Sequence, residues 1–127
     1  MPPLSVLLTD DEEHIRQLIC NWLEQAGHRV TCAATGNEAS ALAKKAAFDL
    51  VVTDILMPDG DGVELIAALK VSQPAARVLA ISGGGRIIDS TDCLRIAQGL
   101  GAHAAVMKPF NREKFLEAVA LAMVPTP

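Results

Sequence analysis

The sequence predicts an α/β fold, a doubly wound sheet of five parallel strands with helices on both faces. Two observations support this. Short runs rich in Leu, Val, Ile and Ala recur along the chain, and a segment with apolar residues at helical spacing follows each run. Strands that alternate with helices pair in parallel, because each helix crosses back over the sheet. Half of the 127 residues are apolar and only 3% are aromatic, so aliphatic side chains must form most of the core.

In the first half of the chain, turn residues separate the expected elements. An apolar run at 4–8 is the first strand, and apolar positions at helical spacing over 15–26 predict a helix that ends at Gly27. A second strand follows at 30–33, and an alanine-rich helix at 37–47. The run at 48–53 reads as a strand buried on both faces, since it is apolar with little alternation.

The second half repeats this alternation. A helix at 63–69 is expected to end before Pro74, because the residue before a proline disfavours helical backbone. The remaining expected elements are a strand at 77–82, a helix at about 90–100 that ends at Gly101, a short strand at 104–107 and a helix at 111–123.

Polar residues stand where four of these strands end. Asp10 and Asp11 follow the first strand, Asp54 the third and Lys108 the fifth, and Ser82 closes the fourth. Alone, Asp54 would more often be a turn or helix-capping residue. However, the carboxyl ends of parallel strands open at one edge of the sheet, where such folds build their sites. We therefore expect the five side chains to lie together.

These residue types suit phosphoryl chemistry. Three carboxylates close together repel one another unless a cation is present, and oxygen ligands suit Mg²⁺. One carboxylate, Asp54, could then act as a nucleophile toward phosphorus and form an aspartyl phosphate. Lys108 could neutralise one phosphoryl oxygen, and the Ser82 hydroxyl could donate a hydrogen bond to another.

Six short motifs span nearly the whole chain: Leu7-Leu8-Thr9-Asp10-Asp11-Glu12, Asp54-Ile55-Leu56-Met57-Pro58, Asp61-Gly62, Ile81-Ser82-Gly83, Gly101-Ala102 and Lys108-Pro109-Phe110. In their residues, order and spacing they resemble the motifs of two-component response-regulator receiver domains of the CheY-like type. That resemblance implies a flavodoxin-like fold. It also implies that Asp54 is the phosphoacceptor, that Asp11 binds Mg²⁺ directly and Asp10 through water, and that the backbone carbonyl of Leu56 completes the protein ligands.

The resemblance further makes Ser82 the switch hydroxyl and Lys108 the phosphate-binding cation, with a cis Lys108-Pro109 bond. One departure concerns the switch. Many relatives carry Tyr or Phe three residues before this lysine, where the present chain has Ala105. The aromatic part of the usual switch is therefore missing. The glycine-rich segment 83–88 is either a slack surface loop or a segment that phosphate orders.

By the same resemblance, residues 1–127 are expected to form a single receiver domain without an output domain. It would be a cytoplasmic signalling protein rather than an enzyme acting on other substrates. A histidine kinase or a histidine phosphotransfer protein would donate the phosphoryl group, and an unknown downstream protein would receive the signal. Whether the chain is a diffusible switch, a relay shuttle or a phosphate sink stays open.

Composition excludes several other functions. The net charge of -4 argues against a nucleic-acid surface, and no apolar stretch is long enough to predict a membrane span. The three cysteines lack metal-ligand spacing, which suggests a reducing cytoplasm and buried thiols. His14 and His28 are expected to be solvated.

One alternative is a phosphatase. The stretch from Asp59 to Gly62, which contains Asp61, resembles the DxDG nucleophile motif of haloacid-dehalogenase-type phosphatases. In that class the nucleophile follows its strand directly, whereas Met57 and Pro58 intervene here after a strand that has already ended. The receiver interpretation is therefore favoured.

Overall fold

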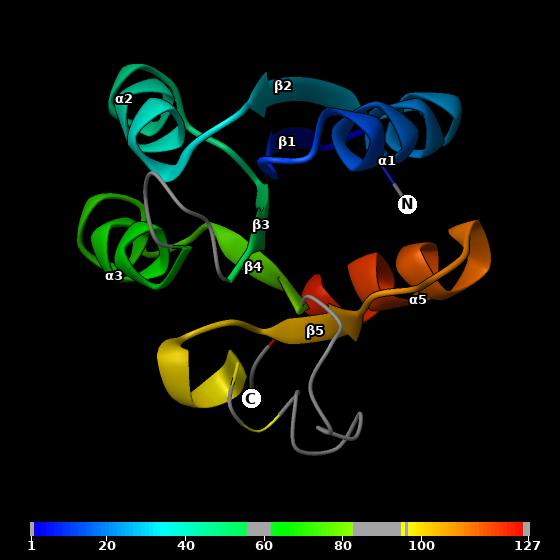
Figure 1. The fold of residues 1–127 in the computed structure, drawn as a ribbon. Helices are drawn as coiled ribbons and strands as arrows, with labels where there is room; N and C mark the ends of the chain where they lie inside the picture. The colour runs from blue at the N-terminus through cyan, green and yellow to red at the C-terminus, as the bar shows by residue number, and fades with distance from the viewer. Residues whose placement is uncertain (1, 56–61, 83–94, 96, 126–127) are drawn as a thin grey trace.

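The structure, a computed structural model, describes residues 2–55, 62–82, 95 and 97–125. Five parallel strands form one sheet in the order β2-β1-β3-β4-β5 (Figure 1). The strands are β1 (Ser5–Thr9), β2 (Arg29–Ala33), β3 (Leu50–Asp54), β4 (Arg77–Ser82) and β5 (Ala104–Met107). The helices with both ends among the described residues are α1 (Glu13–Gln25), α2 (Gly36–Lys45), α3 (Gly62–Ser72) and α5 (Arg112–Ala122). The doubly wound α/β prediction is confirmed.

Element boundaries differ from the prediction by only a few residues. The third strand includes Asp54 itself, and α3 extends three positions beyond the predicted 69. Residues 95 and 97–100 are helical, in agreement with the expected helix at 90–100, most of whose first half lies outside the described residues. No helix in the described part of the chain is both long and apolar enough to cross a bilayer.

Helices cover both faces of the sheet. In Figure 1, α1 and α5 lie on one side and α2 and α3 on the other. Side chains alternate along each strand, so neighbouring residues enter different cores. Leu8 and Val52 pack in the core that includes residues of α1 and α5, and Leu7 and Val51 pack in the core that includes residues of α2 and α3. β1 and β3 are consequently buried on both faces, as their continuous apolar runs predict.

A small aromatic cluster joins α1 to the segment after β5. The Trp22 ring lies 6.1 Å from that of Phe110 and 5.8 Å from that of Phe115, and the two Phe rings are 5.8 Å apart. Phe115 is fully buried. Phe110 directly follows the Lys108-Pro109 bond, which is cis as predicted. The cluster thus holds the backbone near Lys108 against α1.

Two histidines accept hydrogen bonds from strand backbone. Nδ1 of His28, just before β2, accepts from the Leu4 N–H at 3.0 Å, and Nδ1 of His103, just before β5, accepts from the Val78 N–H at 2.9 Å. The expectation that His28 is solvated is wrong, since this residue is 7% exposed; His14 is exposed as expected. His28 is buried through a tertiary contact, since the N–H that donates to its Nδ1 belongs to Leu4, 24 residues earlier in the chain.

Both histidines must stay neutral at Nδ1 to accept these bonds. Burial lowers the pKa of His28, and the charged N-terminus adds to that effect. Burial also lowers the pKa of His103, together with the charges of Arg77 and Lys70. Each protonation therefore opposes folding.

The cysteine prediction fails for one residue. Cys20 on α1 is half-buried, but Cys32 on β2 is exposed, and Cys93 lies outside the described residues. The reason is position, because β2 is an edge strand of the sheet.

We predict that the free energy of unfolding falls when the pH is lowered from about 7.5 to about 5.5, because the unfolded chain protonates its histidines near their ordinary pKa of about 6.5. The folded protein, whose histidine pKa values are lower, takes up fewer protons in this window, so stability is complete above it and is lost below it. Urea unfolding followed by circular dichroism at both pH values measures the change.

The matched variant is His28→Asn combined with His103→Asn, whose amide oxygens can accept the same N–H groups without titrating. Its fall in stability should be smaller than that of the wild type. His14→Asn, at an exposed position, should leave the wild-type fall unchanged. Equal falls in the double variant and the wild type would contradict the assignment.

Candidate functional site

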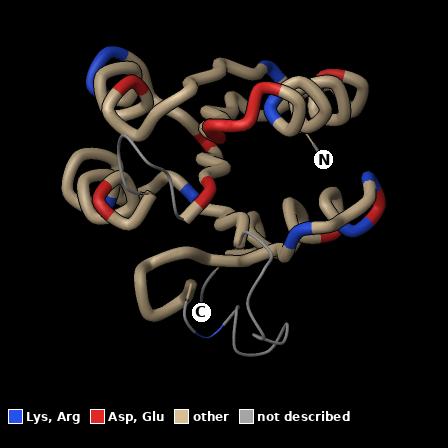
Figure 2. The backbone as a smooth tube through the Cα atoms, in the orientation of Figure 1, with Lys and Arg blue, Asp and Glu red and all other residues tan. Residues whose placement is uncertain are grey.

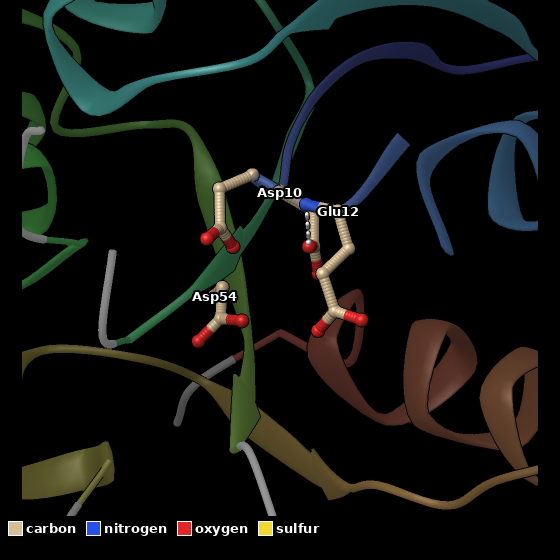
Figure 3. Close-up of side chains that lie close together, drawn as sticks. Asp10, Glu12 and Asp54 are labelled. Carbon is tan, nitrogen blue, oxygen red and sulfur yellow. Dashed lines mark hydrogen bonds between the residues drawn. The ribbon is translucent and has the colours of Figure 1, made fainter. Parts of the chain in front are cut away.

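The two central strands bring acidic residues to one edge of the sheet. β1 and β3 are paired so that Thr9 lies beside Thr53, which places the following residues, Asp10 and Asp54, next to each other. Figure 2 shows acidic positions gathered between the start of α1 and the end of β3, at the centre of the view. In Figure 3, the carboxylates of Asp10, Glu12 and Asp54 lie close together. The predicted convergence of strand ends is present.

Asp10 is the most deeply buried of these carboxylates, with no exposed surface. Its Oδ1 accepts a hydrogen bond from the Glu12 N–H at 2.9 Å, the dashed line of Figure 3. Its buried Oδ2 has no hydrogen-bond partner among the described residues. Burial raises the pKa of Asp10 and the charge of Asp54 adds to this, whereas the Glu12 N–H and Lys108 oppose it without cancelling it. The site therefore contains a buried carboxylate whose charge is incompletely compensated.

Lys108 faces all three carboxylates. Its Nζ lies 2.7 Å from Glu12 Oε1, 3.2 Å from Asp54 Oδ2 and 3.3 Å from Asp10 Oδ2. Burial lowers the pKa of Lys108, but the hydrogen bond to Glu12 and the charges of Asp10 and Asp54 outweigh burial and hold this pKa above its ordinary value. The ammonium thus stays charged, and a single positive charge faces three carboxylates.

The acidic residues also form a group that could hold a metal ion. Asp10, Asp11, Glu12 and Asp54 each offer one carboxylate oxygen, and these oxygens lie within 4.8 Å of one another. Ligands that are all oxygen atoms, an excess of negative charge and a buried Oδ2 with only an ion-pair contact to Lys108 fit a small hard cation such as Mg²⁺. Asp10, Asp11 and Asp54, the predicted side-chain ligands, all belong to this group, whereas Leu56 lies outside the described residues.

Sequence patterns did not identify Glu12 as a member of the site. Its carboxylate makes the shortest contact with Lys108, although its side chain is 58% exposed. The signal available was its place directly after Asp10 and Asp11. That signal could not reveal the contact, because the direction of a side chain between a strand and a helix is not set by periodicity.

Ser82 lies at the same edge, as the last residue of β4. Asp54 pairs with Ile81, so Ser82 is one residue farther along the neighbouring strand. The Ser82 carbonyl accepts a hydrogen bond from the Lys108 N–H at 2.9 Å. The ends of β4 and β5 are thereby joined beside the acidic group.

Ala105, the position where many receiver domains carry an aromatic residue, is partly buried on β5. It pairs in register with Ala80 and packs against the core on the α2 and α3 side. The glycine-rich segment 83–88 and the pair Asp59 and Asp61 lie outside the described residues, so the alternatives attached to them stay untested.

Gly62 brings the start of α3 into contact with the end of β3. A Cβ atom at this position would collide with the carbonyl oxygen of Asp54 and would lie 2.9 Å from the Cα of Ile55. The structure thus gives a reason for glycine at this position, since the backbone that carries Asp54 leaves no room for a side chain.

Comparisons with known proteins agree on one family. The family model described as the response regulator receiver domain matches residues 6–120. Sporulation initiation phosphotransferase F of Bacillus subtilis is 30% identical over 115 residues, which cover 91% of this chain and 90% of that protein. The DNA-binding transcriptional regulator NtrC of Azospirillum brasilense is 32% identical over 126 residues, which cover 97% of this chain.

The chain spans about a quarter of the length of NtrC and of the NtrX-like regulators of Rickettsia that it matches. Among solved structures, the chemotaxis response regulator CheY4 of Vibrio cholerae is similar, with a TM-score of 0.82 and 30% identity. That comparison covers 94% of this chain and 98% of CheY4.

We predict that Gly62→Ala lowers the free energy of unfolding by about 1–3 kcal/mol, the usual cost of overpacking. The added methyl group must displace the backbone of Asp54 or the first turn of α3. Gly99→Ala is the matched control, because Gly99 is also helical but a Cβ there meets nothing within 4 Å. That change should raise stability by about 0.5–1 kcal/mol through helix propensity. Urea unfolding of both variants measures the difference, and a neutral Gly62→Ala would refute the close approach.

Proposed function

Because this chain belongs to the response regulator receiver domain family, the phosphoacceptor domains of two-component signalling, we propose that Asp54 is its phosphoacceptor. The observation that carries the proposal is the carboxylate of Asp54, which ends a central strand 3.2 Å from Lys108 Nζ and within the oxygen group of Asp10, Asp11 and Glu12. A buried carboxylate beside a cation site and a fixed ammonium has the surroundings that phosphoryl transfer requires.

In the proposed reaction, an Asp54 carboxylate oxygen attacks the phosphorus of a phosphohistidine. The new O–P bond forms as the N–P bond breaks, and the electron pair of that bond stays on the imidazole of the donor. Lys108 supplies a positive charge to one phosphoryl oxygen, and the Ser82 hydroxyl donates a hydrogen bond to another. Glu12, which now binds Lys108, would have to yield when the phosphoryl group arrives.

Mg²⁺ is the proposed cofactor. Asp10, Asp11 and Asp54 would hold it, with the Leu56 carbonyl as a further ligand by family resemblance. When bound, the ion neutralises negative charge on the carboxylates and on the phosphoryl oxygens. The protein's own contribution is to hold these acidic groups at the ends of β1 and β3, so that little reorganisation is needed during transfer.

The proposed partners follow from this chemistry. A histidine kinase or a histidine phosphotransfer protein would donate the phosphoryl group, and a downstream protein would bind the phosphorylated form or accept the group in turn. Like other receiver domains it would be a signalling domain, promoting only its own phosphorylation and dephosphorylation. The name of the Bacillus relative, a phosphotransferase of similar length, favours onward transfer as the first role to test.

We predict that purified histidine kinases and histidine phosphotransfer proteins from the same cell transfer a labelled phosphoryl group to the wild type but not to Asp54→Asn. The asparagine keeps the shape of the side chain but lacks the nucleophilic carboxylate. Glu117→Gln removes an exposed carboxylate on α5 and should be labelled like the wild type. Labelling that survives in Asp54→Asn but is lost in Asp59→Asn would instead favour the phosphatase alternative.

A second prediction concerns the charge of Lys108. Lys108→Met should bind Mg²⁺ on the order of tenfold more tightly, because it removes a positive charge that repels the ion across a few ångströms. The same variant should accept phosphoryl groups more slowly. Calorimetric titration with Mg²⁺ measures the first effect, and the labelling assay measures the second. Lys114→Met, at an exposed position of α5, is the control. Weaker Mg²⁺ binding by Lys108→Met would contradict the prediction that the Lys108 charge repels the ion.

A further inference from the structure

Two cysteines face one surface pocket between α1 and the edge strand β2. The pocket has a volume of ≈ 440 Å³ and is lined by Glu13, Arg16, Gln17, Cys20, Asn21 and Cys32. α1 packs against β2, so the two thiols come from neighbouring elements. Neither cysteine belongs to the proposed phosphoacceptor site.

The two cysteines line the same pocket, Cys20 from α1 and Cys32 from β2. Burial raises the pKa of Cys20 to about 12, and the charge and hydrogen bond of Cys32 contribute next, followed by Glu24. Cys32 is two residues after Val30 on β2, so its side chain lies on the same face of the sheet as Val30, which packs against the core that includes residues of α1. The pocket gives them a shared opening to solvent.

We propose that Cys20 and Cys32 are a redox-active pair that forms a reversible disulfide between α1 and β2. Their exposures suit different steps. Cys32 is exposed and can meet a small disulfide from solution, whereas Cys20 is half-buried and packs against the core on the α1 and α5 side of the sheet.

The chemistry is thiol–disulfide exchange, with a low-molecular-weight disulfide as the oxidant. The Cys32 thiolate attacks that disulfide, forms a mixed disulfide and releases one small thiolate. The Cys20 thiolate then attacks the Cys32 sulfur, and the second small thiolate leaves. Two protein thiols are oxidised, one small disulfide is reduced to two thiols, and the protons of the cysteines pass to the leaving thiolates.

A metal site is a weaker interpretation of the same pair. Zinc takes four ligands in structural sites. Among the described residues, the one group of three or more His, Cys, Asp or Glu that could hold an ion is the acidic group around Asp54, and it contains neither cysteine. Two thiols without a third ligand favour disulfide chemistry.

The test uses the full chain carrying Cys93→Ser, so that Cys20 and Cys32 are the only thiols. The folded protein is incubated with glutathione disulfide, then analysed by thiol titration, intact mass and peptide mapping. We expect both titratable thiols to be lost, the mass to fall by two hydrogens and one peptide pair to contain the Cys20–Cys32 link. Dithiothreitol should reverse all three changes.

Matched variants separate the two roles. With Cys20→Ser added, Cys32 should retain one glutathione as a stable mixed disulfide; with Cys32→Ser added, Cys20 should stay largely reduced. Circular dichroism verifies that each variant is folded. Three outcomes would overturn the proposal: accumulation of glutathione on Cys32 in the parent, disulfides only between two molecules, or an internal disulfide that forms only in urea.

Discussion

The contact of the Lys108 ammonium with the carboxylates of Asp10 and Asp54 is the interaction on which the site at the carboxyl ends of the strands depends. Asp10 follows β1 and Asp54 ends β3, and both residues are almost fully buried, at 0% and 4% exposure. A buried charge without a partner costs several kcal/mol. Lys108, from the far edge of the sheet, supplies that partner at 3.2–3.3 Å. The segment after β5 is therefore tied electrostatically to the centre of the molecule.

This contact is strong enough to organise the site but does not neutralise it. One ammonium balances one carboxylate, so at least part of the charge on the remaining acidic groups is left for another cation. The incomplete balance is visible at Asp10, whose pKa is raised chiefly by burial although its Oδ2 lies 3.3 Å from Lys108 Nζ. Excess negative charge of this kind favours the binding of a divalent cation, which the proposed function requires.

Because residue 105 is alanine and not an aromatic residue, a change at the acidic site must be transmitted by other parts of the chain. A methyl group has no rotamers, so no side-chain rotation at this position can report on Asp54. The structure instead contains a backbone hydrogen bond of 2.9 Å from the Lys108 N–H to the Ser82 carbonyl, which connects the ends of β4 and β5. Any shift of Ser82 toward a phosphoryl group would act on β5 through that bond.

Sequence patterns predicted the fold and the convergence of Asp10, Asp54 and Lys108, because both follow from rules of regular structure. Apolar periodicity identifies strands and helices, and parallel strands must end at one edge. The failures all involve contacts that periodicity does not describe. Glu12 lies in a connection, where no rule sets side-chain direction. The burial of His28 depends on an N–H 24 residues away, and the exposure of Cys32 depends on which strand lies at the edge of the sheet.

α1 is the element that connects these separate features. Arg16 donates a hydrogen bond to the Asp10 carbonyl at 2.7 Å, and Trp22 packs on Phe110, two residues after Lys108. One helix therefore contacts the chain on both sides of the charge cluster, through a polar contact at one end and an aromatic contact at the other. Cys20 lies between those two positions, on the face that meets β2. A covalent link there would restrain the helix at its middle, and through Arg16 and Trp22 that restraint would reach both the carboxylates and the lysine that pairs with them.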